Sequence, residues 1–180
     1  NTIASRSTPS TTEISAVKRD IVGAKVNYLA NNFVEIRLSN YGGAIKEVAL
    51  RKFAETLDSQ QRFTLNNEHI EQMLGITGLP GLGEENAYTI VSQSSREVVY
   101  RAIFENRIEV TRRYALPDTS QPGTDPYQIR HETTFRNLTD QTLPLPKIAL
   151  SLGTVSPIND GIYGQQHNSG YFDGEDAHFI

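Results

Sequence analysis

Two residues have side chains suited to chemistry at a site and lie in a pattern that would place them together. Tyr127, Ile129, His131, Thr133 and Phe135 alternate with polar residues, so they would share one face of a strand. A histidine on the concave face of a β-sandwich can act as a general acid or base if a carboxylate orients it. The spacing places no such carboxylate. We therefore interpret His131 as structural, and keep His131 and Tyr127 as candidates for lining a ligand cleft.

Other reactive residue types form no motif. Glu84 and Glu85 follow the glycine-rich run 78–83 and would repel phosphate, so this run is interpreted as a plain loop. No G-x-S-x-G elbow surrounds Ser151, and the absence of Cys excludes thiol chemistry and disulfides. The possible metal ligands near the C-terminus match no metal-binding spacing: His167, Asp173, Glu175, Asp176 and His178. We predict no catalytic residue, no metal and no cofactor.

The charge distribution bears on partners. The 180 residues carry a net charge of −4, and residues 148–180 hold four acids and no Lys or Arg. The rest of the chain is therefore neutral, and Arg112 and Arg113 fit an alternation with acids on a solvent face. A neutral body with an acidic end does not favour nucleic acid as a partner. No stretch approaches the ~20 apolar residues of a spanning helix, so we do not expect this fragment to insert into a membrane.

The elements that must position these residues follow a period of two. Alternation predicts strands near 33–40, 44–50, 97–104, 107–116, 127–137 and 147–155. Gly42 and Gly43 supply the positive φ of a tight turn between the first two. The only helix expected is a short one, capped by Asn66 or Asn67 and ended by Gly75. Without crossover helices, the pattern predicts an all-β antiparallel sandwich with at most one short helix.

The chain divides into three parts. Residues 1–16 are rich in Ser and Thr and are expected to form a flexible tether. Residues 17–156 hold the predicted strands and form the β-sandwich domain. Residues 157–180 are acidic and glycine-rich, and we assign them to the same domain as a C-terminal segment with little predicted order.

Three segments carry a resemblance to a known family. VEIRLSNYGGAIKEVAL (34–50) is followed by EVVYRAIFENRIEVTRRYAL (97–116) and by DPYQIRHETTFRNLTDQTLPL (125–145). This order resembles the periplasmic domain of the YidC membrane protein insertase family. In the last segment, the pattern of that family is filled by Tyr127, Ile129, His131 and Asn137. The resemblance covers roughly residues 24–156.

The resemblance implies a galactose-mutarotase-like supersandwich on the periplasmic face of the bacterial inner membrane, anchored by transmembrane helices that are not in this chain. It also implies that the domain is non-catalytic and supports insertion and folding of nascent membrane proteins, with these proteins and Sec translocon subunits as partners. Two alternatives stay open. One is a mutarotase-like enzyme with His131 as acid or base, and the other is a carbohydrate-binding module, although the chain has no Trp.

Overall fold

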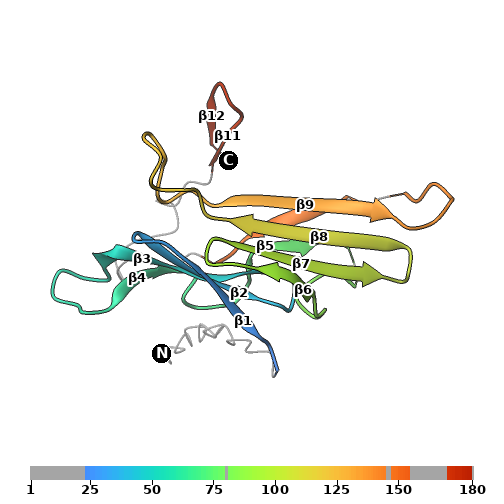
Figure 1. Ribbon diagram of the computed structural model, residues 1–180, viewed down its shortest axis with the longest axis horizontal. Helices are drawn as coiled ribbons and strands as arrows, with labels where there is room; N and C mark the ends of the chain where they lie inside the picture. Colours follow the sequence, from blue (N-terminus) through green and yellow to red (C-terminus); the bar gives the residue numbers. More distant parts are fainter. Residues whose placement is uncertain (1–22, 80, 145–146, 155–169, 180) are drawn as a thin grey trace, which may run out of the picture.

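The computed structural model describes residues 23–79, 81–144, 147–154 and 170–179 (Figure 1). Within these ranges the chain forms β-strands in antiparallel pairs and no helix, which confirms the predicted all-β class. No described helix could cross a membrane. The predicted tether and residues 157–169 lie outside the described residues.

The first sheet contains six strands. β1 (Val26–Ala30), β2 (Val34–Ser39), β3 (Ala44–Ala54), β5 (Met73–Thr77) and β10 (Ala149–Leu152) follow one another across it, and β4 (Arg62–Leu65) also pairs with β3. The strand β3 has 11 residues, which lets it pair with β4 along its second half and with β5 near its start. β4 and β5 are therefore both neighbours of β3.

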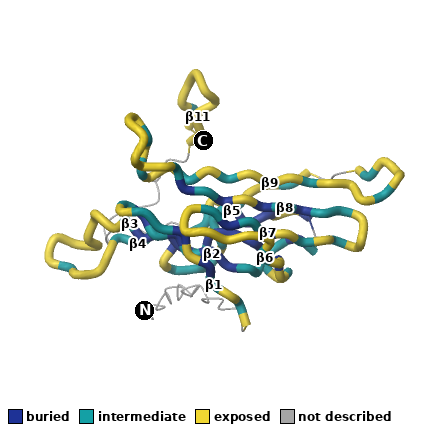
Figure 2. The backbone as a smooth tube through the Cα atoms, in the orientation of Figure 1, coloured by how far each residue is buried: buried dark blue, intermediate teal, exposed yellow. Residues whose placement is uncertain are grey.

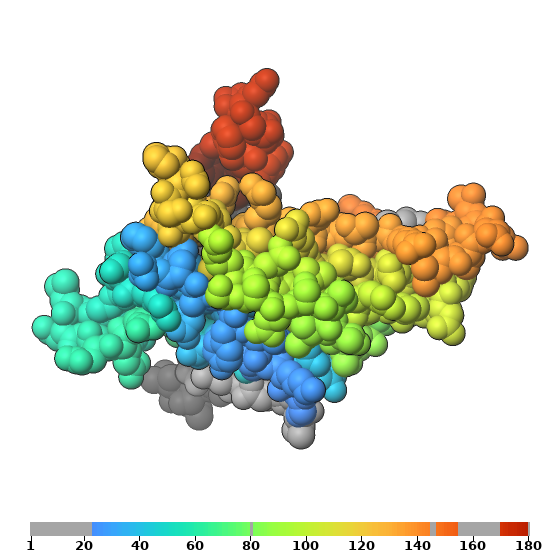
Figure 3. Space-filling view, in the orientation of Figure 1, coloured from blue at the N-terminus to red at the C-terminus, as the bar shows by residue number. Residues whose placement is uncertain are grey.

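The second sheet is a four-stranded meander. It runs in the order β6 (Thr89–Gln93), β7 (Glu97–Phe104), β8 (Ile108–Ala115) and β9 (Arg130–Asn137). A separate hairpin of β11 (Gly170–Phe172) and β12 (Ala177–Phe179) projects beyond this sheet in the view of Figure 3. The strand β9 forms one edge of the second sheet.

The core is built from the apolar faces of both sheets. In Figure 2 the buried residues gather in the strands of the two sheets, whereas the hairpin of β11 and β12 is largely exposed. Leu29, Ile36 and Leu38 of the first sheet are fully buried, as are Tyr100 and Tyr114 of the second. The hydroxyl of Tyr100 donates to Asn27 Oδ1 over 2.9 Å, and that of Tyr114 donates to the Gly43 carbonyl over 2.9 Å. These bonds satisfy buried polar atoms and join the two sheets.

A register shift in β3 explains an irregular pattern in the sequence. Arg37 pairs with Glu47 and Leu38 with Ile45, so Lys46 is an extra residue in β3. Such a bulge reverses which side alternate residues face. As a result Ile45 and Val48 both face the core, and Glu47 faces the other side of the sheet with Arg37.

Several predicted elements differ from the structure. The expected helix is absent, because Asn66 adopts a φ of 61° in a turn and Gly75 lies within β5. β9 begins at Arg130, so Tyr127 precedes the strand, and β10 is shorter than predicted. β1, β4, β5 and β6 were not predicted, since their short apolar runs show little alternation. The hairpin of β11 and β12 gives part of the C-terminal segment strands that were not expected.

Candidate functional site

His131 lies on the inner face of β9 in a cluster of polar and aromatic side chains. Its ring stacks on Tyr114, with 4.7 Å between ring centroids and 24° between planes. Its Nε2 is 2.9 Å from the Thr133 hydroxyl and 3.3 Å from Arg112 Nη2. Because a guanidinium only donates, Nε2 is the acceptor and His131 is neutral. Burial, and then the charge of Arg112, lower the pKa of His131 to about 4.

Arg112 gives this cluster a structural role. Its side chain is fully buried, its Nη1 donates to the Gly42 carbonyl over 2.8 Å, and its Nη2 donates to the Leu74 carbonyl. The prediction that Arg112 belongs to a solvent face is therefore wrong, while Arg113 is exposed and pairs with Glu97 as expected. The contacts of His131 are a cation, a hydroxyl and a ring, and this supports its interpretation as a structural residue.

Tyr127 lies elsewhere, in the loop between β8 and β9. The Asn31 side chain donates to the Pro126 carbonyl over 2.8 Å, and the Tyr127 amide donates to Asp125 Oδ1 over 2.9 Å. These bonds hold the Tyr127 ring edge-on against Phe33, with 5.5 Å between centroids. The structure therefore does not bring Tyr127 and His131 to one strand face, because the loop turns before β9 begins.

An apolar groove of about 610 Å³ lies beside Tyr127. Its walls come from β2, β3, β4, β5 and β10 of the first sheet and from the loop before β9. Every residue of the lining is aliphatic or aromatic: Val34, Ile45, Val48, Leu50, Phe53, Leu65, Met73, Leu74, Tyr127, Ile129 and Leu152. Phe53 is 53% exposed and Leu152 is 71% exposed. The groove is thus an accessible hydrophobic surface rather than a sealed part of the core.

Sequence reasoning found only one residue of this groove as a site candidate. Phe53 and Leu65 belong to strands that meet only through the pairing of β3 with β4. Leu152 reaches the groove because β10 joins the sheet beside β5. A surface made from strands far apart in the chain leaves no local motif. The sequence carries one weak signal of the groove: Phe53, Leu65 and Leu152 are apolar residues in otherwise polar or exposed surroundings.

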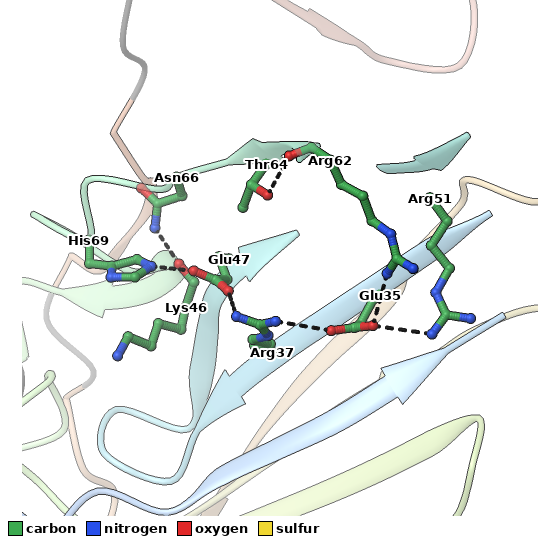
Figure 4. A network of polar contacts seen from close by, with 9 residues as sticks. All are labelled: Glu35, Arg37, Lys46, Glu47, Arg51, Arg62, Thr64, Asn66 and His69. Carbon is green, nitrogen blue, oxygen red and sulfur yellow. Dashed lines mark hydrogen bonds and ion pairs between the residues drawn. The ribbon is translucent and has the colours of Figure 1, made fainter. Parts of the chain in front are cut away.

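A polar network occupies part of the other side of the first sheet (Figure 4). Glu47 is buried and accepts hydrogen bonds from Arg37 and from His69 Nε2. Arg37 also contacts Glu35, and the hydrogen bond from Arg51 to Glu35 is the main cause that holds the pKa of Glu35 below its ordinary value. His69 thus has the oriented carboxylate that His131 lacks, and sequence reasoning missed this pair.

The His69–Glu47 pair has the geometry of an acid–base unit, but it does not face the apolar groove in which a substrate could bind. Neither residue lines the groove, and both carboxylate oxygens of Glu47 are already bonded. Asn66 stabilises the same turn, since its Nδ2 donates to the carbonyls of Lys46 and Glu71, each over 2.7 Å. The arrangement is that of a buttressed turn, and the side chain predicted to cap a helix is one of its main contacts.

The C-terminal acids form a hairpin turn. Asp173 Oδ1 accepts the amides of Glu175 and Asp176, and Oδ2 lies 2.7 Å from His178 Nε2. The backbone amide of Asp176, followed by that of Glu175 and by His178, lowers the pKa of Asp173 to about 2. Across the described residues, no group of three or more His, Asp or Glu side chains could hold a metal ion. His167 lies outside the described residues.

The glycine-rich run forms part of the core packing. Leu79 and Leu82 are buried, and a Cβ on Gly81 would lie 2.1 Å from the Phe104 ring. A second cavity, of about 700 Å³, adjoins this loop and includes Glu84 and Glu85 in its wall. These carboxylates do not suit a phosphate ligand. The groove beside Tyr127 therefore remains the candidate functional site.

A comparison with known proteins found no family model that matches this chain and no curated protein sequence that matches it significantly.

Proposed function

We propose that this chain is a non-catalytic periplasmic domain of a membrane protein insertase, and that its groove holds apolar stretches of nascent membrane proteins while they insert and fold. The observation that carries the proposal is the almost entirely apolar lining of an open groove of about 610 Å³. A hydrophobic segment leaving water gains roughly 25 cal/mol for each Å² of apolar surface that it buries. The groove offers such a surface without a competing polar site.

The order of strands supports the same proposal. The three segments that carry the resemblance to the YidC family correspond to β2–β3, to β7–β8 and to the loop with β9. In this proposal the domain lies at the periplasmic face of the bacterial inner membrane and is anchored by helices outside this chain. Its partners are nascent membrane proteins and subunits of the Sec translocon.

The shape of the groove favours a transient complex. Its volume suits a few apolar side chains, whereas stable protein–protein interfaces bury roughly 1,200–2,000 Å². The costs of association and of ordering a flexible segment offset much of the gain. We therefore expect weak and rapidly reversible binding, which suits a protein that must release its client.

The lining also bears on the carbohydrate alternatives. Phe53 and Tyr127 of the lining form an aromatic cluster with Phe33, and sugars stack on such rings. However, a sugar also needs polar partners for its hydroxyl groups, and the Tyr127 hydroxyl is the only polar side-chain group of the lining. This favours an aliphatic polypeptide segment over a sugar as the occupant.

The test is binding of a fluorescent peptide that carries a short apolar segment of an inner-membrane protein, measured by anisotropy with the 180-residue chain. We expect Phe53→Asp and Leu152→Asp each to weaken binding at least tenfold. Leu57→Asp is the matched control, because Leu57 is fully exposed and is not part of the groove. Equal binding by the groove variants and the control would overturn the proposal, and so would a simple oligosaccharide that displaces the peptide.

A further inference from the structure

The strand β9 differs from the other strands at the edges of the two sheets. β6 and β10 have five and four residues, and each contains a register shift, while β1 has five residues. β9 has eight residues, pairs with β8 without a shift and contains no proline. Its outer edge has no partner among the described residues and lies along the margin of the molecule in Figure 1.

A long, regular edge of this kind is unusual unless something pairs with it. Unpaired N–H and C=O groups on an edge strand are a template for another strand, and proteins commonly block it with short strands, bulges, lysines or proline. The two shifted edges follow that rule, and β9 does not. The length and regularity of β9 therefore indicate an interaction edge.

The charges on the outer face of the second sheet indicate which strand fits there. Glu132 lies opposite Arg113 in the pairing of β8 with β9, and Arg113 is bound to Glu97. Towards the other end of β9, Arg136 lies opposite Glu109. In each of these two rows of residues across the strands, positive and negative charges thus alternate. Each row ends at β9 with one charge that has no opposite neighbour on its outer side among the described residues.

We propose that β9 of one molecule pairs antiparallel with β9 of a second copy of this chain, about a two-fold axis at Thr134. This register places Glu132 opposite Arg136 of the second copy, and it does so twice by symmetry. Each row of alternating charge then continues across the junction. The two four-stranded sheets become one sheet of eight strands with both core faces on the same side.

Among the symmetric registers that keep the core faces on one side, an axis at Thr134 or at Thr133 pairs the most residues of β9. An axis at Thr133 would place Arg130 opposite Arg136, and an axis at Glu132 or at Arg136 would oppose like charges on the axis itself. Like charges directly opposite each other in a sheet are destabilising. The exposed Thr134 at the proposed axis is small and carries no charge.

The absence of Cys from the chain permits a direct cross-linking test. Directly opposite residues in an antiparallel pair have Cα atoms roughly 4.5–5.5 Å apart, which suits a disulfide. Thr134→Cys should therefore give a disulfide-linked dimer in high yield under mild oxidation. Ser92→Cys is the control, because Ser92 is also exposed but lies on the shifted edge strand β6.

Charge reversal tests the register independently. Sedimentation equilibrium of the 180-residue chain should show a reversible dimer. Glu132→Arg and Arg136→Glu should each weaken it at least tenfold, and the double variant should restore it. The double variant keeps both of the unfavourable charge changes beside β8 that the single variants introduce one at a time, so recovery of the dimer could not come from relief within the monomer. Circular dichroism would verify that each variant is folded.

Three results would overturn the inference. The first is a wild-type chain that stays monomeric at millimolar concentration. The second is equal cross-linking of the Thr134→Cys and Ser92→Cys variants. The third is a double variant no more dimeric than the single ones. None of these results bears on the groove, because β9 and the groove residues are different parts of the surface.

Discussion

Arg112 Nη1 donates a hydrogen bond to the carbonyl of Gly42 over 2.8 Å, and this bond joins the middle of the second sheet to the turn between β2 and β3 of the first. The same guanidinium donates to the Leu74 carbonyl and lies over the Tyr114 ring at 5.6 Å. A buried cation thus satisfies carbonyls that would otherwise lack partners. Burial of the ring, and then the positive charge of Arg112, keep neighbouring His131 neutral.

Replacing Arg112 should be costly. Arg112→Ala leaves the carbonyls of Gly42 and Leu74 buried without a donor and opens a cavity, so we expect the free energy of unfolding to fall by about 3–5 kcal/mol. Arg113→Ala, in the next position but exposed, should cost less than about 1 kcal/mol. Urea unfolding followed by circular dichroism would measure both. Similar losses for the two variants would contradict the structural role of Arg112.

The neutral state of His131 predicts an acid-sensitive fold. The folded pKa of about 4 lies below the ordinary value of 6.5, so the unfolded chain takes up a proton first as the pH falls. Stability should be at its full value above about pH 6.5 and should be lost progressively towards pH 4. Because the ring is only partly buried, we expect a loss on the order of 1–2 kcal/mol.

The variant His131→Gln isolates this effect from the other titrating groups. It keeps a polar side chain but cannot be protonated, so its stability should depend less on pH between 7 and 4.5. Urea unfolding of the two proteins at several pH values would give both curves. Parallel curves would mean that His131 does not cause the acid sensitivity.

The register of β9 predicts different effects at adjacent positions. Phe135 packs against the core and is partly buried, so Phe135→Ala should cost about 2–3 kcal/mol. Thr134 points outward, and Thr134→Ala should cost less than about 1 kcal/mol. Unfolding at low protein concentration would avoid any contribution from self-association. Equal losses would show that the strand faces are assigned wrongly.

The turn at Gly43 should tolerate no side chain. Gly43 has a φ of 54°, and an added Cβ would lie 3.0 Å from the Tyr88 ring. We expect Gly43→Ala to lower stability by about 1–3 kcal/mol. Gly123→Ala is a suitable control, because Gly123 also has a positive φ but open space around its Cβ position. If thermal unfolding showed equal shifts, the contact with Tyr88 would not matter.

A non-catalytic domain should not accelerate the interconversion of sugar anomers. A mutarotase must deliver one proton and remove another, which needs two positioned acid or base groups. His131 is neutral and bonded to Arg112 and Thr133, and it lacks an orienting carboxylate among its contacts. Polarimetry of a fresh aldose solution would show the rate with and without protein. An acceleration that His131→Ala abolished would favour the enzyme alternative instead.

The sequence by itself determined the fold class and the faces of the best strands. Val34, Ile36 and Leu38 alternate with polar residues, and all three are buried in β2. The positive φ predicted at Gly42 and Gly43 is confirmed at 70° and 54°. These features are local, because a side chain in a strand points to the side opposite its neighbour and glycine alone adopts such turns freely.

The tertiary structure decided what the individual polar residues do. Arg112 occupies a position that breaks an apolar face, and only the approach of the carbonyls of Gly42 and Leu74 makes its burial favourable. Likewise, Glu47 orients His69 only because an extra residue in β3 turns Glu47 to the other side of the sheet. Neither relationship has a sequence spacing that would predict it.

The groove was also decided by tertiary structure. Phe53, Leu65, Tyr127 and Leu152 are far apart in the chain and lie on different strands or loops. Alternation predicts which face of one strand is apolar, but it does not predict which strands become neighbours. That choice depends on the long-range pairing of β3 with β4 and of β5 with β10, whose free energy comes from burying both sheets together.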